Sequence, residues 1–272
     1  MKRYTKERLW DALVSCTAIF LGLIIVFPVI YCILGAFKTP AEFASPVLLP
    51  KSFAYLENFR NALHQAPLLR YMLNSFITAF TGSLIRLAMA VSAAFVLTHY
   101  DFRGKKLCFF FLLGTMMMPA DTLLMANYAT VSRLGLLNSY LGMIIVSFVS
   151  ASQMFLLRQK FLSFPKALRH AAMLDGCGVL RMLFYVVSPM NKSGLVCVLL
   201  LSFLDAWNMV EQPIAFLKEA AQYPISVALA YTPPSETSVQ LVCCILVVLP
   251  ALFLFTFFNR ELVEGIVLAE VK

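Results

Sequence analysis

The sequence predicts an all-α integral membrane protein with six transmembrane helices and a cytoplasmic coupling helix between helices 4 and 5. Two observations indicate a membrane protein: 61% of the 272 residues are hydrophobic, and only 13% are charged. Soluble domains carry about 25% charged residues. A chain this apolar has too few polar side chains to cover the surface of a water-soluble globule. We therefore expect residues 1–272 to form a single transmembrane domain.

Six stretches are apolar enough to cross a membrane, because a spanning helix needs about 20 mostly apolar residues. They lie at about residues 9–37, 71–98, 107–126, 140–157, 192–210 and 238–258. The first stretch follows a basic N-terminus, as the apolar core of a signal peptide does. It exceeds the roughly 7–15 residues of such a core, and no convincing cleavage site follows it. The sequence therefore predicts an uncleaved first span.

The net charge of +8 gives the orientation of these spans. Fifteen of the 22 lysines and arginines fall on the side of the N-terminus, six fall on the other side, and Arg86 lies within a span. Lysine and arginine collect in cytoplasmic loops. We therefore expect both termini in the cytoplasm, and we interpret the basic excess as a topology signal with no nucleic-acid partner.

The segment 158–189 interrupts the apolar pattern on the cytoplasmic side. Pro165 stands where a helix could begin, and Gly176 and Gly178 stand where it could end. Between them, apolar and charged residues alternate as on a helix at a surface. The segment therefore predicts a short surface helix between spans four and five that docks on a partner.

The sequence lacks the motifs of the common catalytic sites. It contains no G-x-x-x-x-G-K-[ST] phosphate loop, no H-E-x-x-H zinc motif and no G-x-S-x-G nucleophile elbow. The seven cysteines form no C-x-x-C pair, and we interpret them as free thiols. We expect no catalytic residues, no metal site and no cofactor bound by this chain.

Polar side chains are costly inside a membrane, so those within or beside the spans are candidates for a substrate pathway. They are Asn74, Arg86, Asp121, Asn127, Asp205, Trp207 and Asn208. Two interpretations of Arg86 stay open: a structural ion pair with a neighbouring helix or subunit, and a position lining a hydrophilic pathway. Trp207 could likewise anchor the chain at the membrane interface or stack on the apolar face of a sugar.

The segment from Pro165 through His170-Ala171-Ala172, Asp175-Gly176 and on to Pro189 resembles the E-A-A-x-x-x-D-G motif of ABC importer permeases. The similarity extends over nearly the whole chain and is closest to the maltose-type second permease of carbohydrate-uptake systems. Further similarity lies in Phe27-Pro28, Glu57-Asn58-Phe59, Leu73-Asn74-Ser75, Phe102-Arg103-Gly104-Lys105-Lys106, Leu134-Gly135-Leu136-Leu137-Asn138-Ser139, Trp207-Asn208 and the tail 265–272.

This resemblance implies a multi-pass protein of the bacterial cytoplasmic membrane that imports a sugar or oligosaccharide. It implies a heterodimer with a second permease, two ATPase subunits that hold ATP-Mg, and an extracellular or periplasmic solute-binding protein. The residues Pro165, His170, Ala171, Ala172, Asp175, Gly176 and Pro189 would then couple the chain to the ATPase.

The sequence departs from the family pattern at His170, which stands where the motif has glutamate. An anionic contact with the ATPase is therefore not available at this position. The alternative function is an ion-coupled secondary carrier or channel that works without an ATPase. Such carriers often contain repeated halves, and the sequence shows no convincing repeat between its first and last three spans.

Overall fold

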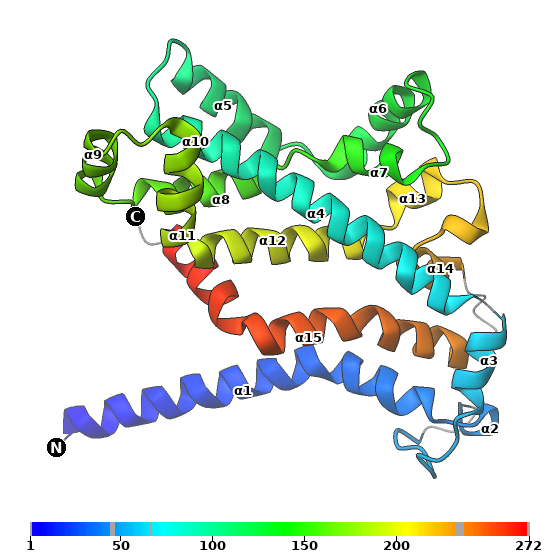
Figure 1. The fold of residues 1–272 in the computed structure, drawn as a ribbon. Helices are drawn as coiled ribbons and strands as arrows, with labels where there is room; N and C mark the ends of the chain where they lie inside the picture. The colour runs from blue at the N-terminus through cyan, green and yellow to red at the C-terminus, as the bar shows by residue number, and fades with distance from the viewer. Residues whose placement is uncertain (1, 44–46, 66, 232–236, 271–272) are drawn as a thin grey trace. The chain divides into compact units, whose positions relative to one another are not determined.

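The computed structural model describes residues 2–43, 47–65, 67–231 and 237–270, and these residues form helices joined by loops (Figure 1). The chain divides into two compact units. The first comprises residues 1–68 and 231–248, and the second comprises residues 69–230 and 249–272. Within the described ranges there is no β-strand, as the apolar composition predicts for a membrane protein.

The first unit contains the long helix α1 (Lys2–Ala36), the short helices α2 (Pro40–Phe43) and α3 (Glu57–Gln65), and the first part of α15 (Thr237–Glu270). A Cβ added to Gly35 would lie 2.5 Å from Leu241 Cδ1, so glycine allows the two long helices to approach closely. The amide of Asn58 donates to the carbonyls of Ala36 (2.8 Å) and Lys38 (2.7 Å). Asn58 thereby satisfies carbonyl groups left free at the end of α1.

The second unit is built on α4, α8 and α12. Its elements are α4 (Leu68–His99), α5 (Lys105–Met116), α6 (Ala120–Arg133), α7 (Tyr140–Ser147), α8 (Ala151–Leu162), α9 (Lys166–Leu174), α10 (Val179–Met182), the π-helical turn η1 (Leu183–Val187), α11 (Ser188–Met190), α12 (Lys192–Trp207), α13 (Glu211–Phe216), the 3₁₀ turn η2 (Ala220–Gln222), α14 (Ile225–Tyr231) and the rest of α15.

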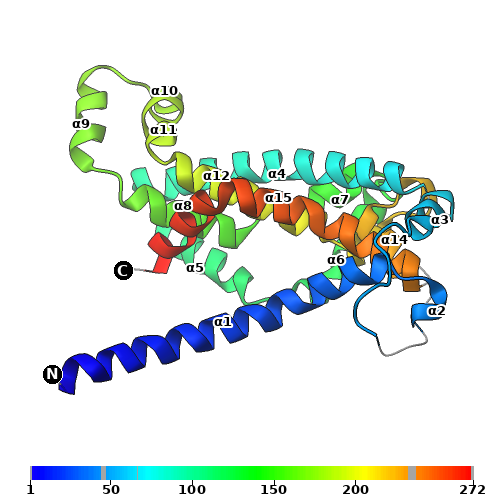
Figure 2. The same ribbon diagram turned by 90° about the horizontal axis from the view of Figure 1, so that it is seen from below.

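One apolar core of this unit joins α4 to α8 and to the segment between α10 and α12. Phe95 of α4, Leu157 and Phe161 of α8, and Val187 and Val198 are at most 2% exposed. Figures 1 and 2 both show α9 at one end of this unit, projecting beyond the helices of the core. The core therefore holds the spans together and leaves α9 accessible.

Three described helices are long and apolar enough to span a membrane on their own: Trp10–Ala36, Leu68–His99 and Val239–Glu264. Two bent pairs pass the same test together. They are Tyr140–Ser147 with Ala151–Leu162, bent by 50°, and Val179–Met190 with Lys192–Trp207, bent by 88°. The described residues thus contain three to five candidate spans, and the count of six stays a prediction.

The stretch 107–126 is not the single helix that its composition suggests. Helix α5 ends at Met116, and α6 begins at Ala120 after the extended residue Pro119 (φ −61°, ψ 137°). Proline has no backbone N–H, and it disfavours helical geometry at the residue before it. The stretch 140–157 is likewise interrupted between Ser147 and Ala151.

Candidate functional site

A polar cluster in the second unit centres on Arg86, in the middle of α4. The Arg86 side chain is buried, its Nε donates to the carbonyl of Ser147 at 2.8 Å, and its Nη1 lies 3.4 Å from Asp205 Oδ2. Ser147 is the last residue of α7, so its carbonyl has lost its helical partner. The guanidinium therefore binds both a free helix terminus and a carboxylate from α12.

Gln153 completes this cluster from the first turns of α8. Its Nε2 donates to Asp205 Oδ2 at 3.2 Å, and its Oε1 is buried with no hydrogen-bond partner among the described residues. The Asp205 side chain is 62% exposed, whereas that of Arg86 is only 7% exposed. The cluster thus joins α4 to α12 and to both sides of the α7–α8 break, and it presents one carboxylate on the surface of the isolated chain.

Trp207 and Asn208, two further candidates for the substrate pathway, differ sharply in exposure. Trp207 is 2% exposed and stacks on Phe203 at 5.7 Å between ring centroids. It lines a cavity of about 790 Å³ whose other walls are almost entirely apolar side chains of α4, α12 and α15. Asn208, the C-cap of α12, is exposed. In this conformation Asn208 is accessible from outside the chain, and Trp207 belongs to the packing.

Asn74 holds a loop of its own chain. It is 6% exposed, and its amide nitrogen donates to the carbonyls of Ala221 and Tyr223, both at 3.0 Å. Both N–H groups of the amide are used in these bonds. Asn127 is half-buried on α6, and Asp121 lies near the start of that helix with its side chain outside the described part of the structure. Among the six candidates whose side chains the structure describes, Arg86 and Asp205 form an ion pair.

The segment 158–189 contains the expected short helix, α9, directly after Pro165. The helix ends in a Schellman motif: Cys177 N–H donates to Ala172 O at 3.0 Å, and Gly176 N–H donates to Met173 O at 3.1 Å. Gly176 has a φ of +71°, a left-handed conformation that glycine adopts without steric cost. The Asp175-Gly176 pair therefore ends the helix and reverses the chain.

Most of the residues with a proposed coupling role lie on the accessible side of this segment. Pro165, His170, Ala171, Asp175, Gly176 and Pro189 are exposed. Ala172 is half-buried and packs against the core that α8 and η1 share with α4. Pro189 lies within α11, after the π-helical turn η1. One side of α9 thus contacts the protein, and the other is free in the isolated chain.

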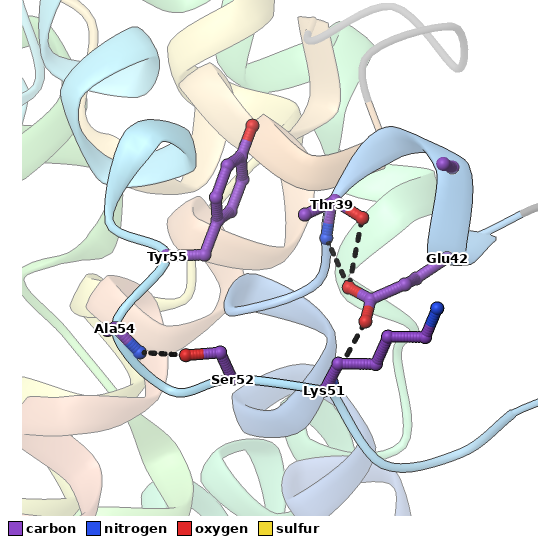
Figure 3. Close-up of a pocket in the computed structure, with 7 residues that line it drawn as sticks. Thr39, Glu42, Lys51, Ser52, Ala54 and Tyr55 are labelled. Carbon is purple, nitrogen blue, oxygen red and sulfur yellow. Dashed lines mark hydrogen bonds between the residues drawn. The ribbon is translucent and has the colours of Figure 1, made fainter.

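A loop of the first unit forms a second concave site, which the sequence motifs do not indicate (Figure 3). The carboxylate of Glu42 accepts from Thr39 N–H at 2.7 Å and from Lys51 N–H at 2.9 Å. These two backbone bonds lower the pKa of Glu42. The ionised carboxylate of Glu42 therefore helps to hold the loop around the cavity.

Two cations of α8, the buried Lys160 and the half-buried Arg158, were also missed by the sequence motifs. Lys160 is 5% exposed, and its Nζ donates to the carbonyl of Glu264 in α15 at 2.5 Å. The guanidinium of Arg158 lies over the ring of Phe109, 4.0 Å from its centroid. The signal that could have found them is a basic residue at the end of an apolar stretch, where a long side chain can extend to a polar group.

The chain is similar over nearly its full length to curated permease proteins, although no family model matches it. It is 26% identical to the diacetylchitobiose uptake system permease protein NgcG of Streptomyces coelicolor, over 96% of this chain and 89% of that protein. It is 25% identical to the polygalacturonan/rhamnogalacturonan transport system permease protein YtcP of Bacillus subtilis, over 98% and 99%. It is 28% identical to the sn-glycerol-3-phosphate transport system permease protein UgpE of Escherichia coli K12, over 79% of each.

The fold also matches a solved structure, that of a bacterial ABC transporter involved in the import of the acidic polysaccharide alginate. The TM-score is 0.83, with 20% sequence identity over 94% of this chain and 97% of that chain. Fold and relatives together define a multi-pass membrane transport subunit. More particularly, the chain is similar to permease subunits of ABC importers, in line with its resemblance to the maltose-type second permease.

Proposed function

We propose that this chain forms half of the pathway of an ATP-driven importer for a sugar or oligosaccharide, and that segment 158–189 couples it to the ATPase subunits. The observation that carries this proposal is the exposed helix α9 with its glycine-terminated end, in a chain whose full-length relatives are uptake permeases. Other members of the complex would be a second permease, two ATPase subunits that bind ATP-Mg, and a solute-binding protein.

The surface of α9 supports a docking role because it carries apolar side chains that nothing in the described chain covers. Leu174 is 88% exposed, Met173 is 56% exposed and Leu168 is 41% exposed. When a partner covers apolar surface of this kind, its removal from water stabilises the complex by about 25 cal/mol per Å². His170 lies among them on the same short helix. We propose that packing, more than an anionic contact, holds α9 on the ATPase.

The proposed topology has six spans in a single transmembrane domain, with both termini on the cytoplasmic side of the bacterial cytoplasmic membrane. The third span would consist of α5 and the start of α6, on either side of the interruption at Pro119. The charge distribution supports this orientation, since it places the basic segments around α9 and at the N-terminus in the cytoplasm.

The names of the relatives favour a carbohydrate as the substrate. Two of them are permeases for diacetylchitobiose and for polygalacturonan or rhamnogalacturonan, and the solved structure with the same fold imports alginate. The sn-glycerol-3-phosphate permease shows that a polyol phosphate is handled by a related chain. For the substrate pathway we propose Asp205 with Arg86 and Asn208, and we retain Asn74, Asp121, Asn127 and Trp207 as positions to test.

The experiment is transport by the reconstituted complex. The chain is co-expressed with the permease, ATPase and solute-binding protein encoded beside it, and sugar uptake into proteoliposomes is measured with and without ATP. We expect uptake only when ATP and both ATPase subunits are present. Equal uptake by the chain alone, driven by an ion gradient, would overturn the proposal in favour of a secondary carrier. The ligand of the solute-binding protein, measured by calorimetry, identifies the substrate.

A further inference from the structure

A small basic cavity lies where α4, α5 and α8 come together in the second unit. Its volume is about 270 Å³, and it is lined by Leu97, Asp101, Lys105, Lys106, Phe109 and Arg158. None of its lining residues belongs to the Arg86 cluster or to α9, and the transport function assigns the cavity no role. Three of its six lining residues are cations and one is an anion.

The arrangement of Arg158 suits a phosphate. Its guanidinium lies 4.0 Å from the centroid of the Phe109 ring, which fixes its plane, and its Nε is buried without a hydrogen-bond partner among the described residues. An unsatisfied buried N–H is costly, by about 1–3 kcal/mol in general. A guanidinium of fixed plane offers paired donors that match the oxygens of a phosphate.

The neighbouring lysines add charge without being neutralised completely. Lys105 Nζ lies 3.0 Å from Asp101 Oδ1 and donates to the carbonyl of Tyr100 at 2.8 Å. Lys106 forms no ion pair within the described residues. Asp101 would repel an anion, but Lys105 compensates it, so Lys106 and Arg158 leave the cavity with an excess of two positive charges.

The surroundings of the cavity are those of a membrane interface. The apolar helix α4 ends at His99, and the exposed aromatic residues Tyr100 and Phe102 follow it. Phe110 and Phe111, which follow the lining residue Phe109 along α5, are 70% and 65% exposed. Aromatic side chains concentrate at the headgroup level of membranes, and exposed phenylalanines beyond it suit contact with acyl chains. A ligand of this cavity is therefore expected to carry both a phosphate and an apolar tail.

We propose that this cavity binds the phosphate of an anionic phospholipid, with Arg158 and Lys106 as the principal ligands and Phe110 and Phe111 against the acyl chains. A headgroup without an ammonium, such as that of phosphatidylglycerol, fits the charge excess better than a zwitterionic headgroup does. Basic pockets between transmembrane helices are known to hold anionic headgroups. The site depends on the membrane insertion of the chain and not on its substrate.

The test is lipid binding by the purified full-length chain. The delipidated protein is titrated with phosphatidylglycerol, with phosphatidylcholine and with inorganic phosphate, and bound lipid is counted by native mass spectrometry. We expect preferential binding of phosphatidylglycerol. The double variant Lys106→Gln/Arg158→Gln should weaken it about 30-fold, because each charge near a membrane surface contributes roughly a factor of five. The variant Lys218→Gln removes an exposed lysine elsewhere in the same unit and should bind as the parent does.

Because Arg158 is partly buried, its substitution could disturb the packing. The single variant Lys106→Gln therefore provides a second binding measurement that leaves the packing intact. It should weaken phosphatidylglycerol binding about fivefold. Equal affinity of the parent and both variants for phosphatidylglycerol would overturn the proposal. Displacement of the lipid by an equal concentration of inorganic phosphate would also overturn the proposal, since the site would then recognise free phosphate. Neither result bears on sugar transport, which the uptake experiment measures separately.

Discussion

Arg86 Nη1 lies 3.4 Å from Asp205 Oδ2, so an ion pair joins the middle of α4 to the end of α12 across 119 residues of sequence. The arginine is buried and the aspartate is largely exposed. The two partners therefore depend on the pair to different degrees. Arg86 has little access to solvent when Asp205 is absent, whereas the Asp205 carboxylate remains accessible when Arg86 is absent.

This asymmetry predicts the outcome of a double-mutant cycle. Asp205→Ala should lower stability by about 1–3 kcal/mol, because it removes a partner of a buried charge. Arg86→Met should lower stability by less than Asp205→Ala does. The double variant should be more stable than the single variant Asp205→Ala. Thermal unfolding of the four proteins in one detergent, followed by size-exclusion chromatography, gives the comparison. Strictly additive losses would show that the two side chains do not interact.

Gly176 tests the coupling role of segment 158–189. At a φ of +71°, valine is strained, so Gly176→Val should distort the end of α9. Gly135 provides a matched control: its φ is +67°, and, as at Gly176, an added Cβ would meet no atom within 4 Å. Both variants should insert into the membrane and lose similar stability, by about 1–2 kcal/mol.

Only Gly176→Val is expected to reduce co-purification of the ATPase and sugar-stimulated ATP hydrolysis, because Gly135 lies between α6 and α7, away from α9 (Figure 1). The measurement is the amount of ATPase retained per permease, together with the rate of phosphate release. Equal retention by the two variants would contradict docking at α9.

Asn74 distinguishes a structural role from contact with substrate. Asn74→Ala removes the hydrogen bonds to the carbonyls of Ala221 and Tyr223, so it should cost about 1–3 kcal/mol of stability. Asn208→Ala, at an exposed position, should change stability by less than about 0.5 kcal/mol. We expect transport by the Asn74 variant to fall in proportion to the folded protein, with an unchanged KM. A raised KM at full stability would instead assign Asn74 to the substrate pathway.

Glu42 predicts the response of the first unit to acid. Hydrogen bonds from Thr39 and Lys51 lower the pKa of Glu42, so its stabilising effect is present above the unfolded-state pKa of about 4.3 and is lost as pH falls through the lower folded-state pKa. Glu42→Gln should therefore melt at a lower temperature than the parent at pH 7, and the difference should shrink below about pH 4. A constant difference across this range would mean that the charge of Glu42 is not involved.

The sequence predicted the helical class and the main apolar stretches, because both follow from local composition. Pro165, Gly176 and Gly178 likewise predicted a short helix in the segment 158–189, since the start and the end of a helix have local sequence signals. The break between Ser147 and Ala151 was not predicted, since that stretch contains neither proline nor an internal charge. A helix break of this kind depends on a tertiary partner that forms hydrogen bonds with the backbone groups freed at the break, as Arg86 does with the carbonyl of Ser147.

The sequence by itself determined that this protein resides in a membrane, where its basic segments gather and which segment stands outside the apolar pattern. Only the tertiary structure decided that Arg86 pairs with Asp205, that Asn74 holds a loop, and that Arg158 and Lys106 share a cavity. The physical reason is that a costly polar group in a membrane must find a partner, and sequence shows this need directly. The identity of the partner depends on distances between helices, which spacing along the chain does not specify.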